Sequence, residues 1–146
     1  MCTLALAFKT DRRWPLLVAA NRDERLARPS EGWLLRNPPR GPRLIAPRDL
    51  VQGGTWAGLS EKGLFAAVTN VHQSAPPDPS RRSRGELVGL ALENARLAGA
   101  RAFCRGAPAQ DYNPFNLLVA SAEEAFLTAT TGRAWNSWTS SPASIS

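Results

Sequence analysis

Short apolar runs separated by polar turns mark the beginning of the chain. Residues 2–8 and 14–20 are almost entirely apolar, and the polar stretch between them contains Asp11. Runs of this length bounded by turn-forming residues are typical of buried β-strands. We therefore predict an antiparallel hairpin that reverses near Asp11 and places Cys2 opposite Ala20 or Asn21.

The middle of the chain continues with loops and further strands. Residues 25–42 are rich in Arg and Pro, which predicts a surface loop, and residues 71–82 form a second Pro-rich connection. A short strand is expected at 44–46, ended by Pro47. The pair Gly53-Gly54 predicts a tight turn or a close backbone approach, leading into a strand that begins at Thr55. Apolar runs predict three more strands at 64–70, 115–120 and 125–130.

One segment changes from the period of a strand to the period of a helix. The apolar residues at helical spacing after Ser83 are Leu87, Leu90, Ala91, Ala95 and Ala98. We predict one long helix here, capped by Ser83 in a capping box with Glu86. Hairpins combined with a long helix predict an α+β fold in which the sheet is antiparallel.

The last residues of the chain show neither the period of a strand nor that of a helix. Residues 134–146 carry two tryptophans and then a stretch rich in Ser and Pro. We therefore predict a domain at 1–133, followed by an aberrant tail at 134–146 of the kind that a frameshift or a truncation leaves.

Composition restricts the classes of function. The chain has 146 residues, of which 43% are hydrophobic, enough for one domain with a real core. No apolar run approaches the length of a membrane span, and Lys9, Arg12 and Arg13 interrupt the apolar start before a secretory signal forms. We therefore expect a cytoplasmic protein without a membrane span. The net charge of +6 comes almost entirely from arginine, but no pattern of a nucleic-acid-binding motif accompanies it, so no nucleic-acid partner is expected.

Cys2 is the main candidate for chemistry. Cys2 and Cys104 lack the spacing of a zinc site, so we expect no metal and no cofactor. Removal of Met1 would leave Cys2 with both a thiol and a free α-amine. Their ordinary pKa values, about 8.5 and about 7.7 to 8.0, allow the amine to accept the thiol proton. In this hypothesis Asp23 holds the amine, and the amide of Asn70 donates to an oxyanion.

The residues around Asp23 have two interpretations. Arg22 is suited to lowering the pKa of the thiol or to pairing with an acidic group of a ligand. The spacing alone favours the simpler interpretation, in which residues 22–25 form a mixed-charge turn screened by water. Asn70 is, in the same view, an ordinary residue at a strand end. The only histidine, His72, lies in a polar connection, and we assign it no role.

Seven motifs occur in the order seen in one known family. They are Met1-Cys2-Thr3-Leu4, Asn21-Arg22-Asp23-Glu24, Arg28-Pro29, Gly53-Gly54-Thr55-Trp56-Ala57-Gly58, Thr69-Asn70, Ser83-Arg84-Gly85-Glu86-Leu87-Val88 and Tyr112-Asn113-Pro114-Phe115-Asn116-Leu117-Leu118. On these motifs the chain resembles the NRDE family, the homologues of transport and Golgi organization protein 2, from residue 1 to about residue 130.

The resemblance implies a fold and an activity. The family is similar to the N-terminal nucleophile (Ntn) hydrolases, which implies a four-layer αββα sandwich, here C-terminally incomplete because the family is longer than this chain. It also implies Cys2 as the nucleophile. Asn21 and Asp23 resemble the segment that carries the catalytic Asp of choloylglycine and penicillin V acylases, and residues 60–70 resemble the segment that ends in their oxyanion Asn. We expect hydrolysis of an amide or thioester in a small-molecule substrate, with catalytic Cys2, Asp23 and Asn70 and with Asn21 and Arg22 binding the substrate.

Two alternatives belong to other classes of function. The family has been linked to haem trafficking, so the same cleft in a non-catalytic protein would carry haem or an acyl ligand. The second alternative is that the chain is an inactive fragment. Missing sheet partners would then leave strand edges open, and the fragment would aggregate.

Overall fold

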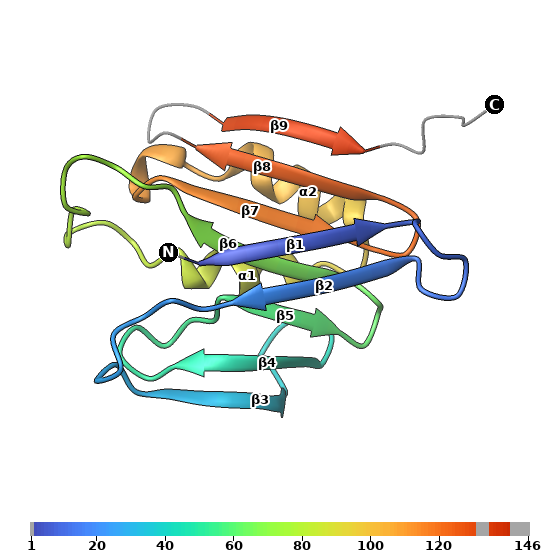
Figure 1. Cartoon of the computed structure of the whole chain (residues 1–146), viewed down its shortest axis with the longest axis horizontal. Coiled ribbons are helices and arrows are strands. Elements are labelled where there is room, and N and C mark those ends of the chain that lie inside the picture. The colour runs from blue at the N-terminus through green and yellow to red at the C-terminus, as the bar shows by residue number, and fades with distance from the viewer. Residues whose placement is uncertain (1, 131–134, 141–146) are drawn as a thin grey trace.

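The chain forms two antiparallel sheets and two α-helices in the computed structural model, which describes residues 2–130 and 135–140 (Figure 1). β1 (Thr3–Phe8) and β2 (Leu16–Asn21) make a two-stranded sheet. The second sheet follows the order of the chain: β3 (Ser30–Arg36), β4 (Leu44–Asp49), β5 (Ala57–Ser60), β6 (Phe65–Asn70), β7 (Phe115–Ala120), β8 (Ala125–Thr130) and β9 (Trp135–Ser140). α1 (Gly85–Leu92), α2 (Leu97–Gly106) and a 3₁₀ turn (Ala109–Asp111) come between β6 and β7. The predicted α+β class is confirmed.

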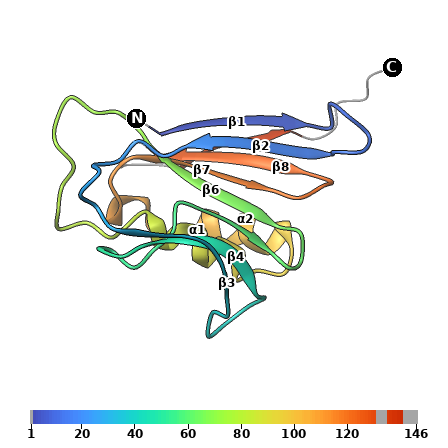
Figure 2. The ribbon, with the colours of Figure 1, turned by 60° about the horizontal axis from the view of Figure 1, so that its bottom comes forward.

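The two sheets and the helices are stacked in layers. Figure 2 shows the β1–β2 hairpin on one side of the large sheet and the helices on the other. Side chains alternate along β6: Ala66 and Val68 pack with the helices, whereas Phe65 and Ala67 pack beneath the hairpin. The described residues thus build three layers of the predicted four-layer sandwich, and no second helical layer occurs among them.

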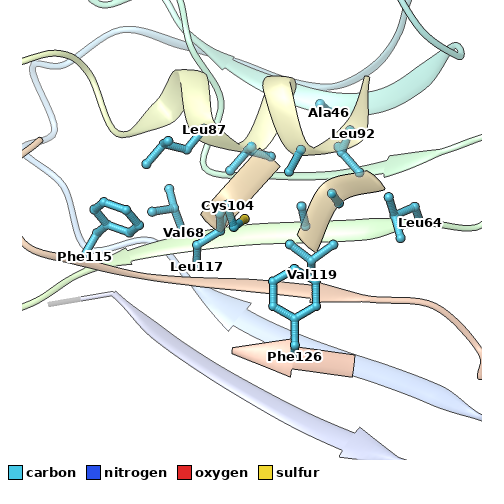
Figure 3. Close-up of a cluster of buried hydrophobic side chains, with 14 of the residues drawn as sticks. Ala46, Leu64, Val68, Leu87, Leu92, Cys104, Phe115, Leu117, Val119 and Phe126 are labelled. Atoms are coloured by element: carbon cyan, nitrogen blue, oxygen red, sulfur yellow. The ribbon is translucent and has the colours of Figure 1, made fainter. Parts of the chain in front are cut away.

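The helix side contains the main core (Figure 3). Leu87, Val88 and Leu92 of α1 are fully buried against Leu117 and Val119 of β7. Of the helix residues, only Leu87 belongs to the apolar period predicted after Ser83, and Ala95 and Ala98 of that period are exposed, because the helix is divided. The strand residues come from the predicted apolar run at 115–120, so local pattern accounts for the sheet side of this core.

The predicted hairpin is present, with a shifted register. The turn forms at Asp11, whose carboxylate accepts hydrogen bonds from the backbone and the guanidinium of Arg13. Asn21 pairs with Thr3 and Ala20 with Leu4, so the prediction that Cys2 lies opposite Ala20 or Asn21 is wrong by at least one residue. Cys2 instead lies just beyond the paired part of the hairpin.

Two predictions for the segment between residues 25 and 49 are wrong. The predicted loop at 25–42 contains β3, the edge strand of the large sheet, because pairing with β4 supplies the hydrogen bonds. Pro47 does not end the strand that begins at Leu44, since β4 continues to Asp49. The register with β3 shifts between Glu31 and Leu34, and this irregularity lies opposite Pro47, which has no N–H to donate.

The predicted single helix is two helices. The side-chain amide of Asn94 donates to the carbonyls of Leu90 and Ala91 and satisfies the end of α1, after which α2 starts at Leu97. The capping box is also wrong: Arg84 precedes α1 without a side-chain cap, and the carboxylate of Glu86 instead bonds Arg82 and the hydroxyl of Tyr112.

The predicted tail is only partly described. Residues 135–140 form β9, which pairs with β8, whereas residues 134 and 141–146 lie outside the described residues. The division at residue 133 stays a prediction. In the described part of the chain, neither helix is long and apolar enough to cross a membrane.

Candidate active site

A cavity of about 340 Å³ opens where the start of β1, the end of β2, the end of β6 and the connection before α1 meet. Its lining includes Cys2, Arg22, Asn70, Arg84 and Trp56. Figures 1 and 2 both show the start of β1 beside the β6–α1 connection. Residues from four distant parts of the sequence therefore share one space.

Cys2 contributes a half-buried thiol to this cavity. Its sulfur lies 4.0 Å from the backbone oxygen of Asp23, to which the S–H group donates. The second cysteine differs in every respect, because Cys104 belongs to the core under the helices and its burial raises the pKa of the thiol to about 12. Of the two thiols, only that of Cys2 is placed to meet a ligand.

Asp23 and Asn21 lie beside Cys2 but do not line the cavity. The side-chain amide of Asn21 donates to the carboxylate of Asp23 at 2.6 Å. The pKa of the Asp23 carboxyl lies below its ordinary value, first because of a hydrogen bond and Coulomb attraction from the chain's amino terminus, and then because of Asn21. Asp23 is therefore held in its charged carboxylate form beside Cys2.

Arg22 reaches the cavity with its guanidinium held in place. The guanidinium stacks 4.1 Å from the centre of the Trp56 ring and donates to Asp49 at 3.2 Å. Arg28 donates to the same carboxylate oxygen at 2.6 Å. Burial alone would raise the pKa of Asp49, but hydrogen bonds from Arg28 and two backbone N–H groups outweigh burial and keep the pKa below its ordinary value. The charged Asp49 thus ties the end of the hairpin to β4.

Asn70 shares a cavity with Cys2, but the arrangement of the strands differs from the one predicted. The prediction supposed that β6 and the hairpin are neighbours within one sheet, but β6 pairs with β5 and β7, and the hairpin covers the face of the sheet. Asn70 is the last residue of β6 and is exposed, and it lines the same cavity as Cys2.

Arg84 lines the cavity, although no role was predicted for it from the sequence. It comes directly before α1, and its guanidinium donates to the carbonyl of Pro114 at 3.2 Å. The pKa of Arg84 lies below its ordinary value, chiefly because burial disfavours the charged guanidinium. Attraction to Cys2 opposes this shift, and repulsion from Arg28 adds to it. The only available signal was its position inside a family motif, since nothing local shows that Arg84 shares a cavity with Cys2.

A glycine turn separates this cavity from a larger one. Gly53 has a φ of +76°, and a Cβ atom on Gly54 would come within 2.6 Å of the backbone of Gly85. Both the predicted tight turn and the predicted close approach are therefore confirmed. Gly54, Thr55 and Gly85 line both cavities. The larger cavity, about 670 Å³, lies between β3–β4 and α1 and contains none of the predicted catalytic residues.

The chemistry of the smaller cavity is that of a thiol among hydrogen-bond donors. A nucleophilic sulfur, an amide N–H₂ and several guanidinium groups surround one space, which suits attack on a carbonyl and stabilisation of the resulting negative charge. Within residues 2–130, no three His, Cys, Asp or Glu side chains are grouped as a metal site requires.

Comparisons with known proteins place the chain among relatives. The family model described as Transport and Golgi organisation 2 matches residues 1–142. The Transport and Golgi organization protein 2 homolog of Bos taurus is 35% identical over 131 residues, which cover 80% of this chain and 45% of that protein. The homolog of Homo sapiens is 39% identical over 93 residues, which cover 56% of this chain and 32% of that protein. The chain thus spans less than half the length of these relatives.

One solved structure is similar in its backbone. A penicillin V acylase from Agrobacterium tumefaciens aligns with a TM-score of 0.48 and 17% sequence identity, covering 75% of this chain and 40% of that one.

Proposed function

The chain belongs to the Transport and Golgi organisation 2 family, and we propose that it is a hydrolase of an amide or thioester with Cys2 as its nucleophile. One observation carries the proposal: the thiol of Cys2 and the amide of Asn70 line the same cavity, although 68 positions separate them in the sequence. A nucleophile and an oxyanion donor around one space are the minimum that acyl transfer requires.

The proposed reaction begins with removal of Met1, which gives Cys2 a free α-amine. The amine takes the thiol proton while the sulfur attacks the carbonyl carbon, and the side-chain N–H of Asn70 donates to the oxyanion. Collapse expels the amine or thiol leaving group, which receives that proton, and leaves a thioester on Cys2. Water then attacks the thioester, returning a proton to the sulfur and releasing a carboxylic acid.

The neighbouring residues have supporting roles in this proposal. Asp23 orients the α-amine that loss of Met1 exposes, in line with the 4.0 Å contact between the sulfur of Cys2 and the backbone oxygen of Asp23. Asn21 positions Asp23 through the 2.6 Å hydrogen bond. Arg22 contacts the substrate from a guanidinium fixed by Asp49 and Trp56.

An activated acyl probe tests the proposal. Intact mass is expected to show loss of Met1 and, after exposure to a thioester probe, one added acyl group at Cys2. Cys2→Ala should abolish this label. Asn70→Ala should slow acylation by about 100-fold, the usual effect of removing one oxyanion donor. Retained Met1, or labelling that is unchanged in Cys2→Ala, would refute the proposed mechanism.

A control separates loss of the nucleophile from loss of the fold. Cys104→Ala removes the other thiol, which is buried and lies outside the cavity. This variant should keep the acyl label on Cys2. Circular dichroism of all three variants should match that of the unchanged chain.

A second candidate function is a carrier of haem or an acyl ligand. The observation in its favour is the larger cavity of about 670 Å³, whose lining includes Leu35, Pro38, Leu44 and Ala46. Cavities of this size and largely apolar character are typical of small-molecule sites.

Filling the larger cavity tests the carrier function. Gly89 of α1 lines it, and a Cβ atom there would meet no atom within 4 Å, so Gly89→Leu places a side chain in open space. Haem titration followed by absorbance should give saturable binding that Gly89→Leu weakens. Binding that Cys2→Ala abolishes would place haem in the smaller cavity instead. An absence of binding would refute the haem carrier.

A further inference from the structure

The cavity around Cys2 contains more arginines than carboxylates. Its lining has five guanidinium groups, and its three carboxylates are Glu24, Asp49 and Asp78. The five arginines are Arg22, Arg28, Arg81, Arg82 and Arg84. At least one of these guanidinium groups can therefore remain without a carboxylate partner and bind an anionic ligand.

Four of these arginines already have carboxylate partners. Arg22 and Arg28 share Asp49, and both lie within 4 Å of Glu24. Arg81 lies 3.5 Å from Asp78, and Arg82 lies 2.7 Å from Glu86. Within the described residues, Arg84 makes no salt bridge.

The geometry of Arg84 leaves one side of its guanidinium available. Nη1 donates to the carbonyl of Pro114, while Nε and Nη2 have no partner among the described residues. These two nitrogens form a planar pair of donors that matches the two oxygens of a carboxylate. The side chain is half-buried, where charge is screened less than at an open surface.

We infer that Arg84 binds a carboxylate group of the ligand that enters the cavity beside Cys2. One unpaired guanidinium balances one negative charge, which a carboxylate carries, whereas a phosphate monoester carries nearly two. The inference rests on the proposed function, because it names the substrate class of the same site: an acyl compound bearing a carboxylate.

The cavity that Arg84 shares with Cys2 supports this placement. Both residues belong to its lining, so one ligand inside it can contact the guanidinium and the thiol. A carboxylate held by Arg84 would therefore bring the rest of its molecule to the sulfur. Such binding is positioning, which raises the rate by fixing the reacting carbonyl near the nucleophile.

Two alkylating reagents of nearly the same shape test the inference. Iodoacetate carries a carboxylate and iodoacetamide carries a neutral amide, and each alkylates a thiolate with loss of iodide. The ratio of their rates at Cys2, followed by peptide mass spectrometry, reports attraction for the carboxylate. Any effect of Arg84 on the thiolate itself cancels in this ratio.

Arg84→Gln should lower the iodoacetate to iodoacetamide ratio about fivefold, as expected for loss of one nearby charge in partly screened surroundings. Arg43→Gln is the matched control, because it removes one exposed arginine that pairs with Glu61 and lies outside the cavity. It should change the ratio by less than about twofold, since water and salt screen exposed charges.

Arg84→Lys keeps the inference testable if Arg84→Gln does not fold. Lysine keeps the charge but lacks the paired donors, so the ratio should fall about twofold. An unchanged ratio in folded Arg84→Gln or Arg84→Lys overturns the carboxylate site and leaves Cys2 as a nucleophile. A ratio that depends on Arg84, in a chain that no acyl probe labels, supports the carboxylate site and refutes the hydrolase. If neither reagent reaches Cys2, the carboxylate site is overturned as well.

Discussion

The helix-covered face of the large sheet and its hairpin-covered face exclude water to different degrees. Leu87 of α1 and Leu117 of β7 are completely buried on the helix side. On the hairpin, Leu6 is 38% exposed and Leu17 is 46% exposed. The two faces have similarly apolar sequences, yet only the helix side forms a closed core.

The hairpin strands are apolar on both of their faces. Leu4, Leu16 and Val18 pack onto the large sheet, while Ala5, Leu17 and Ala19 point the other way and are exposed. A continuous apolar run is typical of a strand covered from both sides. The described residues cover one side, and the chain spans less than half the length of its curated relatives.

Stability and chemistry are located in different parts of the molecule. Most of the buried apolar residues lie on the helix side, whereas Cys2, Arg22 and Asp23 lie at the ends of the hairpin. Functional residues are often drawn from the less stable parts of a fold, because ligand binding requires access.

The two cysteines should show the largest contrast. Burial raises the pKa of Cys104 to about 12, so only about one in ten thousand of these thiols is ionised at pH 8. A neutral thiol reagent should therefore label Cys2 at least about 100-fold faster than Cys104. Peptide mass spectrometry measures both rates. Equal rates in the folded chain would show that the helix side is not a closed core.

Truncation of core side chains should destabilise the helix side most. Leu87→Ala leaves a cavity in the closed core and should lower the free energy of unfolding by about 2 to 5 kcal/mol. Val18→Ala, on the partly buried inner face of the hairpin, should cost about 1 kcal/mol. Urea denaturation measures both. Similar losses at the two positions would contradict the contrast between the faces.

Acid should loosen the link between the hairpin and β4. The pKa of Asp49 is lowered in the folded chain, so its contribution to stability is present above the unfolded pKa of about 3.9 and is lost as pH falls through the folded pKa. Asp49→Asn should lower the free energy of unfolding at pH 7 by about 1 to 3 kcal/mol. Below about pH 4, the stability of this variant should fall less steeply with pH than that of the unchanged chain. Thermal unfolding against pH gives the measurement.

Asp11→Asn is the control for this acid effect. The Asp11–Arg13 pair is exposed at the hairpin turn, so water screens it and its removal should change stability little. If the loss of stability at low pH is the same in Asp49→Asn as in the unchanged chain, carboxylates other than Asp49 cause that loss.

A charge on the outer face of the hairpin should have the smallest effect on stability. Leu17→Lys places an ammonium where the side chain is already exposed and should change the free energy of unfolding by less than about 0.5 kcal/mol. It should also reduce self-association, measured by light scattering, because it interrupts an exposed apolar strand. If Leu17→Lys lowered the free energy of unfolding as much as Val18→Ala does, the side chain of Leu17 would have to be buried.

Local pattern determined much of the fold. The strands at 115–120 and 125–130 and the hairpin turning at Asp11 follow from runs of apolar residues and from turn residues a few positions apart. The glycine turn follows from the missing side chains of Gly53 and Gly54. The position of Cys2 near Asp23 also follows from the predicted hairpin. The exact register of its two strands does not follow from the sequence pattern.

Most of the remaining features depend on contacts between residues far apart in the sequence. β3 forms because β4 supplies its hydrogen bonds, and the helix divides where Asn94 reaches back to α1. Asp49 pairs with Arg22, and Arg84 lines the same cavity as Cys2, across separations of 27 and 82 positions. The physical reason is range: backbone propensity and apolar period act over a few residues, whereas charges and side-chain donors meet their partners only after the layers have packed.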